Sequence, residues 1–405
     1  MRYLLLGFLC LGTVIAYLQR LALSAPTKLI ERDLKFGPED MGMVMAAWFW
    51  GYALFQLPSG WMADRFGARR SLIGFAILWS AFTALSGWAG DLTTLALLWC
   101  LMGCAQAGLL PAATKLIGGV FPATQQAFAS GALGGCMSLG AALSHWLAPK
   151  LLEDFEWREV LMLYALPGAA WAMAIAFFSK SFERRPCVHV PAGRTKIDWL
   201  RLLTDRSMQL LCGQQFLRAA AMAFFFTWFP RYLTQTRGIT ALHAGELAFW
   251  PLIAGMFGGF VGGVISDSLL KNTQNAWLAR QGFACFCMAI CGATALAAFF
   301  VTQTIPIITL LCLGAFWGTA GGVSGYSISM AYGGKQVASV FAAMNMSGNI
   351  GAGLFPLIVG WIVAMTDNWN LALLVFASLF ALSGICWAFL NPQGTLFAED
   401  EEIAA

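Results

Sequence analysis

The segment Gly60-Trp-Met-Ala-Asp-Arg-Phe-Gly-Ala-Arg-Arg70 ends a long apolar stretch, and its first part recurs as Gly263-Val-Ile-Ser-Asp267. Each copy places a glycine four residues before an aspartate, near the end of a segment long enough to span a membrane. Arg20 and Arg218 recur at a similar interval of about half the chain, and such a repeat predicts two halves related by an axis along the membrane normal.

Composition sets the class of protein. The 405 residues are 59% hydrophobic and only 11% charged, whereas soluble domains carry about 25% charged residues. This excludes an ordinary soluble domain and predicts an all-α, multi-pass membrane protein with about twelve spans of about 20 residues. The expected spans are 3–24, 40–62, 71–90, 92–120, 124–149, 158–180, 207–230, 242–266, 277–301, 304–332, 337–365 and 369–390. The first could also be a signal peptide, but the repeat favours a retained helix.

The longest polar stretch, 181–206, separates the spans into two sets of six. We expect an N-terminal half at 1–180, a cytoplasmic linker at 181–206, a C-terminal half at 207–392 and an acidic tail at 393–405. Connections after even-numbered spans carry most of the Lys and Arg, which predicts cytoplasmic N- and C-termini. The eleven cysteines lie almost entirely in apolar segments without metal-ligand spacing, so no metal or other cofactor is expected.

Arg20 lies in an otherwise uncharged apolar segment that runs from Tyr3 to Leu23. An arginine at bilayer depth costs about 2.5–3.5 kcal/mol on insertion scales, and such residues usually face a bundle interior. Tyr17 lies one turn away on the same face. The pattern predicts anion binding at Arg20; the alternative is that the side chain reaches the lipid headgroups from a helix end.

Asp64 closes the second expected span, and arginines follow one and five residues later. A carboxylate at a helix end can bind the N-terminus of a neighbouring helix and hold one side of the protein shut through charge-assisted hydrogen bonds. Asp64, Arg65, Arg69 and the second copy's Asp267 are therefore candidate gating residues. The alternative is a cytoplasmic basic cluster with an incidental aspartate.

The segment from Gly60 to Arg70 resembles the signature loop of the major facilitator superfamily. Within it, the chain is most similar to the anion:cation symporter family of sugar-acid, phthalate-type and phosphate-type transporters. The stretches that carry this resemblance are 17–26, 48–70, 226–245 and 345–360. It implies a twelve-helix transporter fold, with substrate contacts from Arg20, Tyr17, Tyr52, and Asn345 or Asn349.

Two positions depart from that family. Its proton-coupled sugar-acid members carry carboxylates where this chain has Gln19 and Gln106. Glutamine has no titratable group and is unable to carry a proton. His145 and Glu246 are the remaining candidates within the expected spans. The co-transported species therefore stays open among H⁺, Na⁺ and a counter-anion.

Arg218 lies in mid-span, within Gln214-Gln-Phe-Leu-Arg218. Paired arginines in the first and seventh spans resemble organophosphate:phosphate antiporters, although Arg218 sits about one helical turn from the expected place. A guanidinium suits phosphate and carboxylate alike. Otherwise Arg218 makes an interhelical or headgroup contact. Lys115 is either a third cationic contact or a headgroup contact.

These observations predict a secondary active transporter of a small organic anion, working by alternating access, monomeric, and placed in a bacterial inner membrane. One alternative is an organophosphate/phosphate-type antiporter. Another is a transporter-fold sensor that binds an anion without moving it. No nucleophile-base pair or phosphate-cradling loop occurs, so we expect neither an enzyme nor a nucleic-acid partner.

Overall fold

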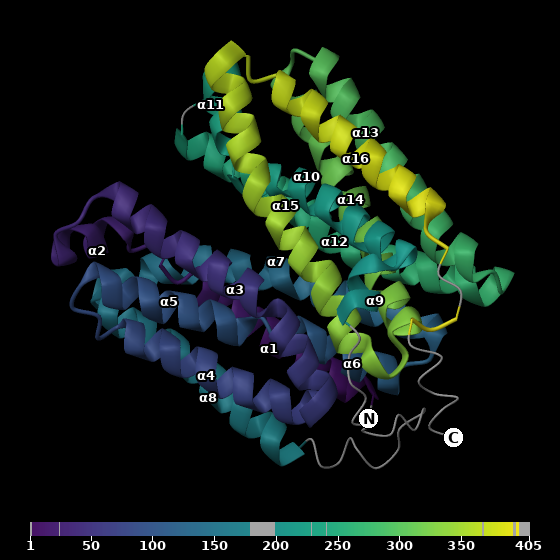
Figure 1. Cartoon of the computed structure of the whole chain (residues 1–405). Coiled ribbons are helices and arrows are strands. Elements are labelled where there is room, and N and C mark those ends of the chain that lie inside the picture. The colour runs from purple at the N-terminus through teal and green to yellow at the C-terminus, as the bar shows by residue number, and fades with distance from the viewer. Residues whose placement is uncertain are drawn as a thin grey trace. The chain divides into compact units, whose positions relative to one another are not determined.

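The computed structural model describes residues 2–23, 25–178, 199–227, 229–239, 241–366, 368–391 and 394–396, and within them it contains helices and no strands (Figure 1). The N-terminal half contains α1 (Arg2–Arg20), α2 (Thr27–Leu34), α3 (Pro38–Phe66), α4 (Ala68–Ser86), α5 (Leu92–Gln106), α6 (Leu109–Val120), α7 (Ala123–Asp154) and α8 (Trp157–Phe178). The C-terminal half contains α9 (Trp199–Thr204), α10 (Arg206–Thr227), α11 (Phe229–Arg237), α12 (Ala241–Thr273), η2 (Leu278–Gly282), α13 (Phe283–Phe300), α14 (Thr304–Gly333), η3 (Gly334–Gln336), α15 (Val337–Thr366) and α16 (Leu371–Phe389).

Over the described residues, each expected span coincides with a helix or with two consecutive helices, which confirms the predicted all-α fold class. The fourth span is α5 followed by α6, and the ninth is η2 followed by α13. By length and composition, eight stretches of the described residues are long and apolar enough to cross a membrane. The expected linker is helical at its end, where α9 lies; residues 179–198 and 397–405 fall outside the described residues.

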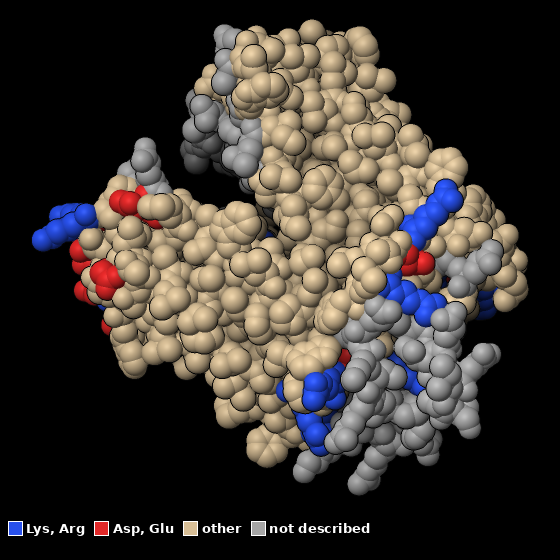
Figure 2. All heavy atoms as spheres, in the orientation of Figure 1, with Lys and Arg blue, Asp and Glu red and all other residues tan. Residues whose placement is uncertain are grey.

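The helix surfaces suit a lipid environment. Large apolar side chains are exposed along the helices, among them Leu54, Phe177 and Ile305. In Figure 2, the described charged side chains on the visible face gather at a few places near its margin, and the broad area between them carries none. A soluble protein rarely exposes so much contiguous apolar surface. The chain is an integral, multi-pass membrane protein.

The described chain packs as two compact units. Unit 1 comprises Met1–Phe121, Cys136–Lys196 and Lys335–Ala342; unit 2 comprises Pro122–Gly135, Ile197–Gly334 and Ala343–Ala405. In two helices, the first residues therefore pack in the unit formed mainly by the other half of the sequence. The start of α7 belongs to unit 2, and the start of α15 belongs to unit 1. The limits 1–180 and 207–392 remain a prediction.

Candidate functional site

Arg20 lies among aromatic rings in unit 1. Its guanidinium carbon is 3.8 Å from the ring centre of Trp48, 5.1 Å from that of Phe49, 5.2 Å from that of Tyr17 and 5.7 Å from that of Tyr52. Trp48 also stacks on Tyr52, with ring centres 4.7 Å apart. Within the part of the chain that the structure describes, no carboxylate pairs with Arg20. A guanidinium stacked on a ring keeps its in-plane N–H groups available for an anion.

Arg20 occupies the last turn of α1, whereas the sequence places it inside a longer apolar segment. A cation in a last helical turn is favoured by the helix dipole. A side chain at a helix end could reach the lipid headgroups. The guanidinium of Arg20 is instead half-buried and lies over the ring of Trp48, on α3. Trp48 and Phe49, which sequence reasoning did not assign, therefore belong to the same cluster as Tyr17, Arg20 and Tyr52.

Gln19 and Gln106 are buried, 0% and 4% exposed. The Nε2 of Gln19 donates to the carbonyl oxygen of Tyr164 at 2.7 Å, and the Nε2 of Gln106 donates to that of Ala16 at 2.9 Å. An ionised carboxylate has no proton to donate and would lose both hydrogen bonds. The two amides thus tie α1 to α8 and α5 to α1 without titrating.

Arg218 lies in the middle of α10, in unit 2, and is half-buried. Its Nη2 donates to Oε1 of Gln215 at 2.9 Å. Its Nε is buried and has no hydrogen-bond partner among the described residues. This arginine is therefore paired with a neutral amide, and its positive charge is not compensated by any described acid.

The other predicted substrate contacts lie on α15, in unit 2. Asn345 is buried, and its carbonyl oxygen accepts a hydrogen bond from Nδ2 of Asn349 at 2.8 Å. The structure thus brings Tyr17, Arg20 and Tyr52 together in unit 1. The side chains of His145 on α7 and Glu246 on α12 lie outside the described set.

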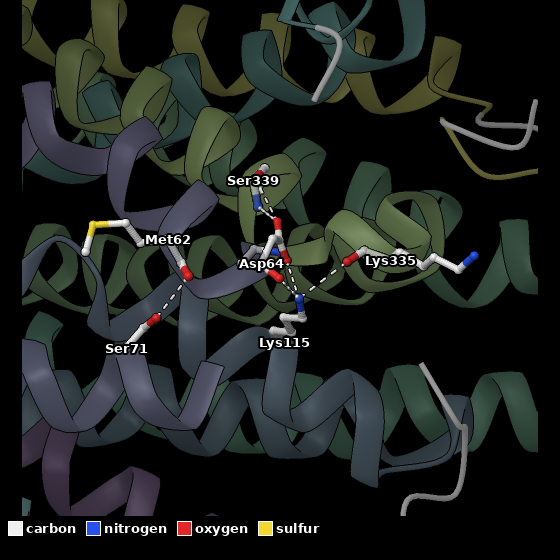
Figure 3. A network of polar contacts seen from close by, with 7 residues as sticks. Met62, Asp64, Ser71, Lys115, Lys335 and Ser339 are labelled. Carbon is white, nitrogen blue, oxygen red and sulfur yellow. Dashed lines mark hydrogen bonds and ion pairs between the residues drawn. The ribbon is translucent and has the colours of Figure 1, made fainter. Parts of the chain in front are cut away.

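Asp64 holds a polar network in unit 1 (Figure 3). Its Oδ1 accepts from Nζ of Lys115 at 2.6 Å, and its Oδ2 accepts from the backbone N–H and the hydroxyl of Ser339 at 2.8 and 2.7 Å. The N–H of Ala338 lies 3.4 Å from Oδ1, and Nζ of Lys115 also reaches the carbonyl oxygen of Lys335. Ala338 and Ser339 belong to the first turn of α15, whose N–H groups and dipole favour an anion.

Asp267 makes the corresponding contacts in unit 2. Its Oδ2 accepts from the N–H of Phe128 at 2.8 Å and its Oδ1 from that of Ala127 at 3.3 Å, both near the start of α7. Nη2 of Arg280 lies 2.8 Å from Oδ1 and also donates to the carbonyl oxygen of Ala123. Its Nη1 donates to Ser266 at 2.7 Å. Each carboxylate thus fastens the start of a helix from the other half of the sequence.

The glycine four residues before each aspartate permits the close approach of the helices. A Cβ at Gly60 would lie 2.7 Å from the carbonyl oxygen of Ala338, and one at Gly263 would lie 2.6 Å from that of Ala127. Contacts this short would push the backbones apart. In both copies of the Gly-x-x-x-Asp pattern, the glycine therefore lets a helix start approach closely enough to bind the carboxylate.

Two predicted gating residues lie elsewhere. Arg65 is exposed and stacks over the ring of Trp61 at 4.9 Å, and Arg69 donates to the carbonyl oxygen of Ala176 at 3.3 Å, which joins α4 to α8. The cations on the two aspartates are Lys115 and Arg280. Sequence spacing gave no signal for either, because α6 and η2 are not equivalent positions in the two halves.

The described residues include no cluster of three His, Cys, Asp or Glu side chains able to hold a metal.

Known proteins match this chain along nearly its whole length. It is similar to a probable sulfoacetate transporter of Cupriavidus necator, 27% identical over 99% of this chain and 96% of that protein. It is also similar to a hexuronate transporter of Bacillus subtilis, 27% identical over 96% of each chain.

Among solved structures, the chain resembles the transporter FucP in its outward conformation, with a TM-score of 0.77 at 16% identity, over 96% of this chain and 99% of that one. The family model described as Major Facilitator Superfamily matches residues 9–324. Since this match covers most of the chain, the protein belongs to the major facilitator superfamily.

Proposed function

We propose that this protein is a secondary active transporter that moves a small organic anion, a sugar acid or another carboxylate, across a bacterial inner membrane by alternating access. The observation that carries the proposal is the guanidinium of Arg20, which is stacked on Trp48 and has no described acid to neutralise it. Small organic acids are what the related proteins named above carry.

Arg20 binds the carboxylate in this proposal. A planar guanidinium presents two parallel N–H donors to a carboxylate, and hydrogen bonds to charged groups contribute about 1.5–3 kcal/mol. Stacking on Trp48 fixes the plane of the fork before the anion arrives. The hydroxyls of Tyr17 and Tyr52, and the amides of Asn345 and Asn349, orient the hydroxyl groups of the substrate.

Asp64 and Asp267 act as gates. Their hydrogen bonds hold the starts of α15 and α7, and release of those bonds allows the protein to change state. Lys115 and Arg280 neutralise the two carboxylates. Arg65 and Arg69 support the same cytoplasmic side, which also carries both termini, and the transporter works as a monomer.

Coupling proceeds without proton carriage at the first and fifth helices, because Gln19 and Gln106 do not titrate. Exchange for a counter-anion suits this arrangement. His145 and Glu246 remain the candidates for H⁺ or Na⁺ symport.

The test is ligand-induced thermal stabilisation of the purified protein by sugar acids, other carboxylates, phosphate esters and neutral sugars, with and without Arg20→Gln. We expect carboxylates to stabilise the wild type, and Arg20→Gln to weaken binding by about tenfold to a hundredfold. The matched control is Arg32→Gln, since Arg32 is an exposed arginine on α2.

Unchanged affinity in Arg20→Gln would contradict the role of this residue. Stabilisation by phosphate esters alone would favour an organophosphate antiporter. Uptake of the labelled anion into liposomes separates a transporter from a sensor, because a sensor would bind the anion without moving it.

A further inference from the structure

Two cysteines from different helices meet in unit 1. Cys10 lies on α1 and Cys136 on α7, and a hydrogen bond joins their thiols. Both side chains are partly exposed, whereas those of Cys287 and Cys291 on α13 are buried. A buried thiol is usually inert, so partial exposure separates the pair of Cys10 and Cys136 from cysteines that only fill the core.

The packing of α1 against α7 brings the two thiols together. One turn beyond the cysteines, a Cβ on Gly140 of α7 would lie 2.4 Å from the carbonyl oxygen of Val14 and 2.9 Å from Cβ of Tyr17, both on α1. Since helical residues four apart share a face, this close approach and the thiol contact lie on the same faces of the two helices. The cysteines therefore lie beside a point of direct backbone contact. A disulfide needs such closeness, with Cβ atoms about 3.5–4.5 Å apart.

A second thiol contact differs from this one in an instructive way. Cys104 hydrogen-bonds to Cys100, but these two residues lie one turn apart on the same helix, α5. Their side chains lean in the same direction, and a bridge between them would join no separate elements. A bridge between Cys10 and Cys136 would instead close a loop of about a third of the chain. Crosslinks that close long loops restrict the unfolded chain most.

Cys136 lies where α7 passes between the two units. Residues Pro122–Gly135 pack in unit 2, and α7 belongs to unit 1 from Cys136 onward. The start of α7 is held by Asp267, which accepts from the N–H of Phe128. A movement of one unit against the other therefore has to bend or shift α7 close to Cys136.

We propose that Cys10 and Cys136 form a redox switch, in which their disulfide fixes α1 to α7 and slows the proposed transport. The bridge holds α7 at the residue where this helix has to move, and it ties α7 to the helix that carries Arg20 in its last turn. The slowing of transport rests on the proposed function, whereas the formation of the disulfide does not.

The oxidant is a peroxide, which is small and uncharged and enters apolar surroundings. The thiolate of one cysteine attacks a peroxide oxygen, the O–O bond breaks, and a sulfenic acid and a hydroxide form. The thiolate of the other cysteine attacks the sulfenic sulfur, the S–S bond forms, and a second hydroxide leaves. The two thiol protons convert the hydroxides to water, and the two electrons lost by the thiols reduce the peroxide. Dithiothreitol reverses the bridge by thiol–disulfide exchange.

Peptide mapping of the purified full-length protein by mass spectrometry tests the bridge. After treatment with hydrogen peroxide and alkylation of the remaining thiols, we expect a crosslinked peptide that contains Cys10 and Cys136 and that dithiothreitol separates. Oxidation should also raise the melting temperature of the wild type, because the crosslink restricts the unfolded chain. Cys10→Ala and Cys136→Ala should show neither change. Cys312→Ala, which removes another half-buried thiol, is the matched control and should behave like the wild type.

The effect on transport is measured as uptake of labelled sulfoacetate and labelled D-glucuronate into liposomes. We expect hydrogen peroxide to remove most of the uptake by the wild type, and dithiothreitol to restore it. Cys10→Ala and Cys136→Ala should keep their uptake in peroxide, whereas Cys312→Ala should lose and regain it as the wild type does.

The absence of a crosslinked peptide in the wild type would overturn the proposal, and so would a bridge that leaves uptake unchanged. An equal loss of uptake in Cys10→Ala would show that peroxide acts elsewhere, and would also overturn it. If the reduced wild type neither binds carboxylates nor takes up either acid, the proposed function fails, and the slowing of transport with it. The crosslinked peptide would then still show, independently, that the two thiols react with each other.

Discussion

The networks around Asp64 and Asp267 both hold the start of a helix on a carboxylate, but they use different cations. In both, a carboxylate accepts backbone N–H groups near a helix start, and a glycine four residues earlier lets the helix approach. Lys115 makes one short contact, at 2.6 Å, and two long ones, at 3.4 and 3.5 Å, to the carbonyl oxygens of Lys335 and Asp64, and it is 20% exposed. Arg280 is 6% exposed and bonds three separate groups. The Asp64 network is therefore looser, and the Asp267 network is more rigid.

The difference follows from the side chains. An ammonium is a compact charge on a flexible stem, and it loses little when a single contact breaks. A guanidinium is a planar fork that fixes several acceptors at once. Within unit 2, Arg280 therefore joins Ser266, Asp267 and the first turn of α7 into one piece. Under the proposed gating role, we expect the Asp64 network, with Lys115, to open more readily than the Asp267 network.

The largest expected effect is the loss of Arg280. Arg280→Gln leaves the buried carboxylate of Asp267 without its cation, a change that typically costs about 3–5 kcal/mol. Lys115→Gln should cost about 1–3 kcal/mol, because Asp64 keeps its hydrogen bonds to Ser339 and its partly exposed site admits water. Thermal unfolding in detergent measures both, with Arg32→Gln as the exposed control.

The relative stability of Arg280→Gln and Lys115→Gln tests whether the Asp267 network is the more rigid of the two. A smaller drop in melting temperature for Arg280→Gln than for Lys115→Gln would show that the short hydrogen bonds of the cation do not set the strength of the two networks. Equal drops would indicate that both cations act only as point charges.

Gly60 and Gly263 represent the feature that the two networks share, the close approach of a helix start to the segment that carries the aspartate. Gly60→Ala and Gly263→Ala each place a Cβ within 2.7 Å of a carbonyl oxygen on the partner helix, and overpacking of this kind costs about 1–3 kcal/mol. We expect similar losses of thermal stability in both variants. Gly74→Ala, which meets nothing within 4 Å, should be neutral or slightly stabilising. A large effect at one glycine alone would mean that the two helix starts are not seated alike.

Much of this arrangement was predictable from sequence periodicity. Apolar length gave the spans, and the repeated Gly-x-x-x-Asp pattern gave both carboxylates and their helix-binding role. The cations were not predictable, because Lys115 and Arg280 come from helices that the repeat does not relate. Sequence spacing favoured the adjacent Arg65, but that side chain turns outward onto Trp61.

The cluster around Arg20 was predicted in part. Tyr17 lies one turn from Arg20, so helical spacing alone places the two together. Trp48 and Phe49 come from α3, and only the packing of α1 against that helix identifies them as neighbours of the guanidinium. The end of α1 at Arg20 was also missed, because the apolar composition continues for several residues beyond the helix.

The smallest expected effect concerns a hydroxyl present in only one of the two networks. Ser339 offers Asp64 both its N–H and its Oγ, whereas Phe128, at the corresponding place in the other network, offers Asp267 its N–H alone. Ser339→Ala should therefore cost about 0.5–1.5 kcal/mol, less than a typical hydrogen bond to a charged group, because Asp64 keeps Lys115 and the backbone N–H groups. Combined with Lys115→Gln, it should cost more than the sum of the two single changes, because Asp64 then loses both side-chain donors and keeps only backbone N–H groups. A double-mutant cycle on melting temperature measures this coupling, and strict additivity would show that Lys115 and Ser339 stabilise the start of α15 independently.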